Sequence, residues 1–214
     1  MVKSHIKLIS REVLPALVVI MIIAFIVQVK FSNPASMPFW ASMLLLAWLN
    51  RDPNRNIPLE PLSVIAPVDG RITAVEEAMM PLIARPGLKI ALRRNFLQVF
   101  RIFSPTEGKI HAICIIPVSG KFPWLNRFFG AIAVWIKTDE KDDVLFLVKS
   151  IRIIGRSRIY AQTGARVGKG QRMGYCPFAF SYEVYMPLNS RLLVKPKQKV
   201  TAVVSEIAEF VHKH

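Results

Sequence analysis

Side chains that can do acid–base or nucleophilic chemistry are sparse in this 214-residue chain. Cys114 and Cys176 lie in apolar runs with no CxxC spacing and no Cys/His cluster, so a zinc site is not expected. Both are interpreted as buried free thiols in a reducing compartment. His111 is the one histidine outside the terminal segments, and it begins an apolar stretch, where a structural role is the commoner one. Residue chemistry alone therefore shows no complete catalytic set.

A recurring turn signal surrounds one carboxylate, Asp69, which precedes Gly70. Residues 66–72 (APVDGRI) resemble residues 116–122 (IPVSGKF), and residues 164–171 form a third glycine-containing turn. Each segment predicts a strand, a tight turn and a returning strand. Hairpins of this kind recur in barrel-sandwich folds of the biotinyl and lipoyl type, although no carrier lysine of that type is visible.

The elements that must position these residues are mainly β. After Arg55 the chain consists of short runs rich in Val, Ile and Phe, punctuated by Gly and Pro, from Val64 to Val204. This pattern predicts an antiparallel, barrel-sandwich-like body. Within this body, only residues 123–129 and 205–213 are predicted to be helical.

The N-terminal quarter of the chain accounts for much of its 52% hydrophobic content. Residues 13–29 and 31–50 carry no charge and are separated by Lys30, with a turn signal at residues 33–36 (NPAS). A bilayer core of roughly 30 Å is crossed by about 20 apolar helical residues. Residues 1–50 are therefore predicted to form a transmembrane helical hairpin, and residues 51–214 a separate domain. A hydrophobic pair of core helices is the alternative.

Positive charge dominates both flanks of the predicted hairpin and the domain that follows it. Basic residues precede and follow the apolar runs, which places both chain ends and the body on the cytoplasmic side by the positive-inside bias. The first 50 residues hold only four of the 29 basic residues and one of the 14 acidic ones, so the body carries about +12. Such a field attracts anionic lipid or nucleic acid. No helix-turn-helix, zinc spacing or aromatic RNA-binding motif favours nucleic acid, and a mere aid to solubility is the alternative.

A series of short segments resembles the short, membrane-anchored form of the phosphatidylserine decarboxylase family. The family patterns FFRDPxR, SPADGR, FLSP, PVxG and GxRFG…VYLP are matched in order and at similar spacing. The matching segments are residues 49–55 (LNRDPNR), 66–71 (APVDGR), 103–105 (FSP), 117–120 (PVSG), 170–174 (GQRMG) and 184–187 (VYMP).

The resemblance implies a defined chemistry. The family converts phosphatidylserine to phosphatidylethanolamine and CO2 with a pyruvoyl group, which forms when a serine hydroxyl attacks the preceding carbonyl of its own chain. An Asp and a His assist. Asp69 matches the family Asp, and the candidate for the His is His111, which lies two residues after the family position. The resemblance also implies a phospholipid substrate, a bacterial-type inner membrane and a possible homodimer. Residues 153–158 (IIGRSR) match only part of a family IAGxxARR stretch. Its Arg156 and Arg158 either bind a lipid phosphate or belong to an ordinary solvated strand end.

Departures from the family pattern fall on the self-cleavage motif. Residues 174–187 read GYCPFAFSYEVYMP, which has the same length as the family's GMIRFGSRVDVYLP, so Ala179 and Phe180 occupy the Gly-Ser positions. Ser181 is one residue late and faces the opposite side of a regular strand, unless a β-bulge re-aims it. Asp69 is equally explained as a turn cap, and Lys109 stands where the family histidine is expected.

Two hypotheses therefore remain open. The first is a phosphatidylserine decarboxylase-family protein of phospholipid metabolism that cleaves itself, unusually, between Phe180 and Ser181. The second is a non-catalytic relative that needs no cofactor and binds an aminophospholipid or a partner protein. A basic scaffold for another membrane enzyme is a third, which rests on charge alone.

Overall fold

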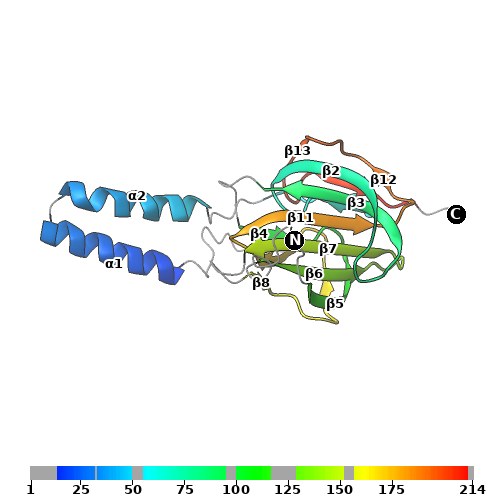
Figure 1. Cartoon of the computed structure of the whole chain (residues 1–214), viewed down its shortest axis with the longest axis horizontal. Coiled ribbons are helices and arrows are strands. Elements are labelled where there is room, and N and C mark those ends of the chain that lie inside the picture. Colours follow the sequence, from blue (N-terminus) through cyan, green and yellow to red (C-terminus); the bar gives the residue numbers. More distant parts are fainter. Residues whose placement is uncertain are drawn as a thin grey trace. The chain divides into compact units, whose positions relative to one another are not determined.

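A computed structural model describes residues 14–31, 33–49, 55–94, 100–116, 129–151 and 157–211. The chain divides into two compact units, residues 1–54 and 55–214 (Figure 1).

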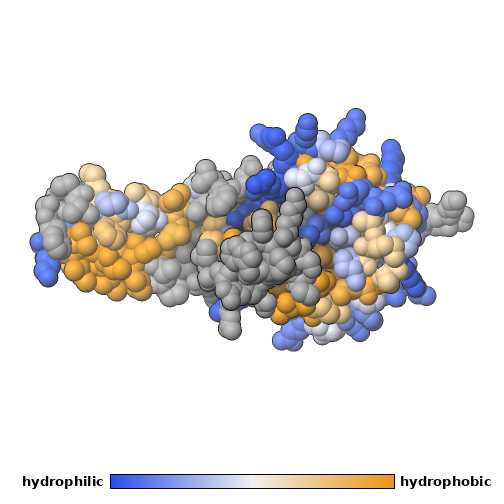
Figure 2. Space-filling view, in the orientation of Figure 1, coloured by the Kyte–Doolittle hydropathy of each residue, from blue (hydrophilic) through white to orange (hydrophobic). Residues whose placement is uncertain are grey.

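The first unit is a pair of helices, α1 (Leu14–Phe31) and α2 (Asn33–Leu49), which pack against each other. Ala24 and Ser36 are buried, and Trp40 Nε1 donates a hydrogen bond to Gln28 Oε1 at 3.3 Å. Most other large side chains of the pair are apolar and exposed, which Figure 2 shows as a hydrophobic surface over the hairpin. Exposed apolar patches of this kind mark surfaces that contact lipid or protein.

The predicted transmembrane hairpin is not supported. Two helices are present, as expected. Among the residues that the structure describes, no helix is both long and apolar enough to cross a membrane.

The second unit is mainly β and antiparallel, as predicted, and its main sheet is curled (Figure 1). That sheet has the order β13-β2-β3-β11-β7-β6-β5-β9. Its strands are β2 (Gly70–Met79), β3 (Pro86–Arg93), β5 (Gly108–Ile116), β6 (Phe129–Lys137), β7 (Asp143–Ile151), β9 (Arg166–Val167), β11 (Ala179–Met186) and β13 (Lys199–Val200).

Two three-stranded sheets complete the unit, in the orders β1-β14-β12 and β4-β10-β8. Their strands are β1 (Ser63–Ile65), β4 (Arg101–Phe103), β8 (Arg158–Ile159), β10 (Arg172–Tyr175), β12 (Arg191–Leu192) and β14 (Glu206–Glu209). The helix predicted for residues 205–213 is wrong, because residues 206–209 pair with β1 and β12. Tertiary pairing overrides local helix propensity here. The other predicted helix lies largely outside the described residues, and its last residue, Phe129, begins β6.

Strand alternation gives the curled sheet an inner and an outer face. Tyr182, Val184 and Met186 point inward to the main core, where Tyr182 stacks on Phe146 with ring centroids 6.3 Å apart. Tyr185 belongs to a smaller apolar cluster on the outer face. At one end of the sheet β2, β6 and β11 begin while β3 and β7 end, and we call this the Ser181 end.

Candidate functional site

Family-like segments that are distant in sequence are hydrogen-bonded to one another. The amide of Phe103 donates to the carbonyl of Pro67 at 3.0 Å, which joins the FSP segment to the APVDGR turn. Ser104 N donates to Gln171 O at 2.9 Å, and Gly170 N donates to Ser104 O at 3.0 Å. Three of the segments that carry the resemblance therefore form one structural unit.

Asp69 lies in the turn that leads into β2, where it forms an ion pair with Arg55. The guanidinium binds both carboxylate oxygens, with Nη1–Oδ1 at 2.5 Å and Nη2–Oδ2 at 2.7 Å. Oδ1 also accepts the backbone N–H of Ala202 at 2.8 Å, and the carbonyl of Ala202 accepts from Arg55. The two side chains are only 12% and 13% exposed. Asp69 thus links Arg55 and the turn of residues 201–205 to the start of β2.

Gly70, next to Asp69, is required by close packing. A Cβ atom at this position would lie 2.5 Å from the carbonyl oxygen of Arg93 on β3, closer than real Cβ contacts occur. The Asp-Gly pair therefore has a structural explanation in which the carboxylate anchors and the glycine lets β2 and β3 approach.

A β-bulge is present at the start of β11. Ala179 pairs with Ser150 of β7 and Ser181 pairs with Lys149, so Phe180 is the extra residue. Ala179 accordingly packs in the main core, whereas Ser181 is half-buried on the outer face. Phe180 is 40% exposed and contacts the ring of Phe129 edge-on at 5.8 Å between centroids. The β-bulge that the sequence allowed as an exception to regular strand alternation is thus present. Because of it, Ala179 and Ser181 point to opposite faces of the sheet.

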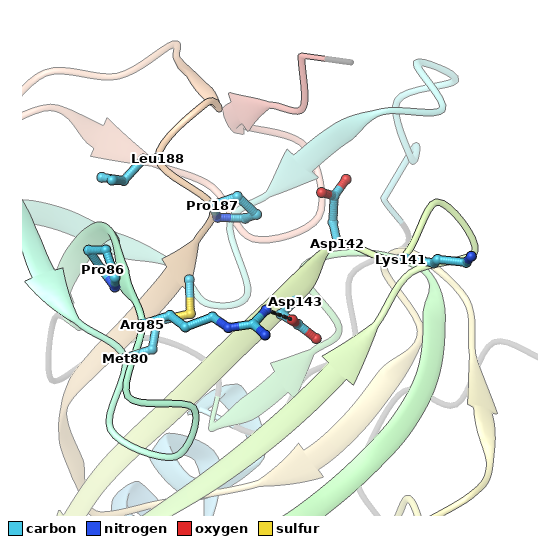
Figure 3. Close-up of a pocket in the computed structure, with 8 residues that line it drawn as sticks. All are labelled: Met80, Arg85, Pro86, Lys141, Asp142, Asp143, Pro187 and Leu188. Carbon is cyan, nitrogen blue, oxygen red and sulfur yellow. Dashed lines mark ion pairs between the residues drawn. The ribbon is translucent and has the colours of Figure 1, made fainter. Parts of the chain in front are cut away.

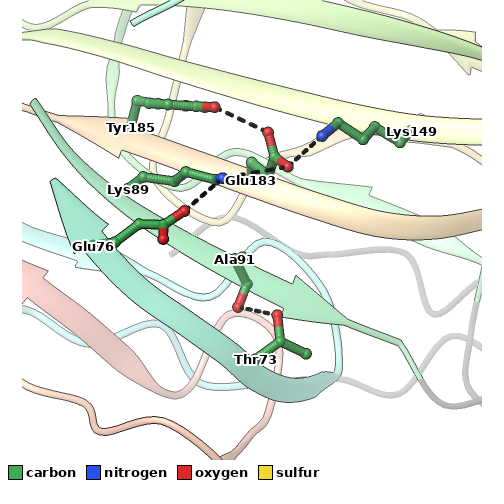
Figure 4. Close-up of polar contacts among 7 residues, drawn as sticks. All are labelled: Thr73, Glu76, Lys89, Ala91, Lys149, Glu183 and Tyr185. Atoms are coloured by element: carbon green, nitrogen blue, oxygen red, sulfur yellow. Dashed lines mark hydrogen bonds and ion pairs between the residues drawn. The ribbon is translucent and has the colours of Figure 1, made fainter. Parts of the chain in front are cut away.

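Figure 4 shows an ion-pair network on the sheet, and one of its members, Lys149, pairs in register with Ser181. Glu183 has a side chain that is only 6% exposed, and its carboxylate binds Lys149 Nζ and accepts the Tyr185 hydroxyl at 3.0 Å. Lys89 Nζ lies 3.9 Å from Glu183 Oε1. It pairs more closely, at 2.8 Å, with Oε1 of exposed Glu76. The pKa of Tyr185 is raised, mainly by burial of its hydroxyl and further by the nearby Glu183 carboxylate.

Cys176 is buried three residues before Ala179. Its Sγ lies 2.7 Å from Ser157 Oγ, which in turn donates to Ser150 Oγ at 3.0 Å. Arg94 holds the same turn by donating to the carbonyls of Cys176 and Pro177, at 3.2 and 2.7 Å. Burial raises the pKa of the Cys176 thiol despite these polar neighbours, so the neutral, unreactive form is favoured.

The prediction of two buried free thiols is confirmed for Cys176 and wrong in part for Cys114. Cys114 pairs with Ala133 on the outer face of β5 and is half-buried. Solvent reaches that face of the strand, because only the inward-facing side chains of β5 enter the main core.

His111 lies on β5 near the opposite end of the sheet. Its ring packs on Trp135 at 4.2 Å between centroids. Three inter-strand steps and several residues along the strands separate it from Ser181. The structure therefore places Asp69 and Ser181 toward one end of the sheet and His111 toward the other.

Of the two predicted phosphate-binding arginines, the structure describes only Arg158, which directly follows Ser157, the residue whose hydroxyl donates to Ser150 of β7. Arg158 is exposed on β8, in the small sheet with β10 and β4. Arg156 lies outside the described residues. Sequence reasoning missed Arg55, Lys149 and Glu183, although Arg55 ends the segment matched to the family pattern FFRDPxR and offered one signal.

A shallow pocket of about 220 Å³ also lies at the opposite end of the sheet (Figure 3). It is lined by Met80, Arg85, Pro86, Lys141, Asp142, Asp143, Pro187 and Leu188. Arg85 and Asp143 form a loose ion pair at 3.7 Å, and Asp143 also accepts the indole N–H of Trp135 at 2.9 Å. None of its lining residues belongs to the Ser181 end.

A pyruvoyl group, which the resemblance implies, does not fit the residues at the family's cleavage position. Phe180 stands where the group's serine precursor is required and has no hydroxyl. Ser181, the nearest hydroxyl on β11, faces outward beside Lys149. The one family carboxylate, Asp69, is fully engaged by Arg55 and Ala202.

Comparison with known proteins agrees with the resemblance. The family model described as phosphatidylserine decarboxylase matches residues 44–205. The chain is 31% identical over 206 residues to the phosphatidylserine decarboxylase proenzyme of Nitrosomonas europaea, covering 95% of both chains. It is 30% identical over 213 residues to the proenzyme of the same name from Burkholderia cenocepacia, covering 94% of this chain and 96% of the relative.

No solved structure matches the chain. The family model nevertheless covers most of the sequence, including Asp69, the FSP segment and the β11 bulge. These matches establish that the chain belongs to the phosphatidylserine decarboxylase family.

Proposed function

We propose that this chain is a non-catalytic member of the family that binds an aminophospholipid through its β body at a membrane surface. The observation that carries the proposal is Phe180, the bulged residue of β11, at the position of the pyruvoyl-forming serine. A phenyl side chain supplies no oxygen for attack on the preceding carbonyl.

Charge and apolar exposure support the lipid-binding part. The body carries about +12, which favours anionic headgroups. Helices α1 and α2 expose apolar side chains such as Phe25, Val29 and Met37, which suit contact with lipid.

The state of the family-like carboxylate supports the non-catalytic part. Asp69 is bound on both oxygens, and moving a proton would require it to give up a buried ion pair with Arg55.

A second candidate is self-cleavage between Phe180 and Ser181. The bulge favours it, because it sets Ser181 directly across from Lys149 on a half-buried face. Lys149 Nζ is, however, already bound to the Glu183 carboxylate, so it is not free to take a proton from Ser181.

An assay with phosphatidylserine separates the two candidates. The purified full chain is reconstituted with vesicles of phosphatidylcholine and phosphatidylserine, and phosphatidylethanolamine is measured by lipid mass spectrometry. We expect no phosphatidylethanolamine above the protein-free control, together with tighter binding than to phosphatidylcholine vesicles. Steady formation of phosphatidylethanolamine would overturn the non-catalytic proposal and favour cleavage before Ser181.

A further inference from the structure

Three basic residues form a row across neighbouring strands at the Ser181 end of the sheet. Lys199 of β13 pairs in register with Arg71 of β2, and Arg71 pairs with Arg93 of β3. Residues directly opposite one another in a sheet point to the same face. All three side chains are exposed. We call Lys199, Arg71 and Arg93 the basic row.

The basic row is electrostatically unfavourable by itself. Like charges directly opposite in a sheet destabilise it, and here the repulsion is repeated on two strand pairs. None of the three side chains forms an ion pair or hydrogen bond with another residue in the described part of the chain. Other basic side chains of the sheet do find carboxylates, as Lys149 does with Glu183. An external anion would relieve this repulsion.

Strand geometry makes the row suitable for a phosphate. Neighbouring strands lie about 4.8 Å apart, so the three residues span roughly 10 Å. A guanidinium binds phosphate oxygens through two parallel N–H groups, and Arg71 and Arg93 stand side by side. A phosphodiester with two free oxygens can thus be held between them, with Lys199 adding charge at the edge.

The row continues toward Ser181. Leu92 of β3 pairs with Tyr182 of β11, so the next residues, Arg93 and Ser181, follow on the same outer face. Exposed Phe180 adjoins them in the bulge. A cationic row with an apolar neighbour is the composition expected of a surface that meets lipid headgroups and the acyl boundary beneath them.

We propose that the basic row is a binding subsite for the phosphate of an anionic glycerophospholipid presented by a bilayer. The headgroup beyond the phosphate then lies over β11 beside Ser181. This inference rests on the proposed function and assigns the residues that recognise the lipid, which differ from Arg156 and Arg158.

The test uses the double variant Arg71→Gln/Arg93→Gln of the full chain. Its matched control is Lys109→Gln/Lys137→Gln, which removes another exposed, in-register basic pair at the opposite end of the same sheet. Partitioning is measured by co-sedimentation with phosphatidylcholine vesicles, alone or mixed with phosphatidylserine. Thermal unfolding checks both variants, and removal of the like-charge pair is expected to leave Tm unchanged or slightly raised.

We expect the row variant to partition about 25-fold more weakly onto the phosphatidylserine vesicles, since each basic residue near an anionic surface contributes about five-fold. The control variant should differ from the wild type by less than about three-fold. Binding to pure phosphatidylcholine should be equal for all three proteins. An equal loss in both variants, or no loss in the row variant, would refute the assignment.

Two further outcomes separate this inference from its alternatives. If wild-type chain shows no preference for phosphatidylserine vesicles, the proposed function itself fails. If it shows the preference and the row variant keeps it, only the subsite is wrong. Inorganic phosphate added at the concentration of accessible lipid should not displace the chain; displacement would identify a site for free phosphate and contradict the lipid assignment.

Discussion

Replacing Asp69 with alanine is expected to lower the free energy of unfolding by about 3 kcal/mol, because it leaves the Arg55 guanidinium buried without its counter-charge. The same change removes the acceptor of the Ala202 amide, next to Val203, whose φ of 71° is unusual for a β-branched residue. Urea unfolding of the wild type and variant gives the value.

The matched control for this prediction is Asp139→Ala. Asp139 also pairs with an arginine, Arg166, but the two side chains are 55% and 69% exposed. Pairs of this exposure contribute about 1 kcal/mol or less. Similar small losses in both variants would mean that Asp69 is not committed to a structural ion pair, and its carboxylate would again be free for chemistry.

Replacing Glu183 with alanine is expected to cost about 2 to 3 kcal/mol of unfolding free energy. The change leaves Lys149 and the Tyr185 hydroxyl without their shared acceptor on a largely buried surface. Lys89 and Lys149 are partly exposed, at 20% and 29%, so their side chains can turn toward water. The loss of unfolding free energy therefore stays below that of a fully buried pair.

Glu76→Ala provides the comparison within the same network. Glu76 is 53% exposed and, among the described residues, binds Lys89 alone, so its loss should destabilise the protein far less than the loss of Glu183. If the two glutamate variants unfold at the same urea concentration, then Glu183 is not the central anion of the network that Figure 4 shows.

The sequence predicted the class of the fold well, because strand formation in the body follows from Val, Ile and Phe runs separated by Gly and Pro. Arg71–Val75, Leu88–Leu92 and Tyr182–Met186 all fall inside observed strands. The failures came where pairing partners decide structure: residues 206–209 are held in a sheet by β1 and β12, which no local pattern reveals.

The candidate site was only partly predictable. Motif matching found Asp69 and the displaced Ser181, and strand alternation showed that a bulge would change which face the serine occupies. The sequence could not show that Arg55, fourteen residues away, engages the carboxylate. It also could not show the cross-strand register that sets Arg71 beside Arg93, since register depends on long-range pairing.

Intact-protein mass spectrometry of the purified, detergent-solubilised chain tests the central claim most directly. The account predicts a single species near 24.2 kDa, because Phe180 cannot start self-cleavage and Asp69 is held by Arg55. Two fragments, residues 1–180 and a short chain that begins at position 181 with a blocked N-terminus, would contradict it. That result would identify Ser181 as the precursor of a pyruvoyl group and restore this chain to the catalytic members of its family.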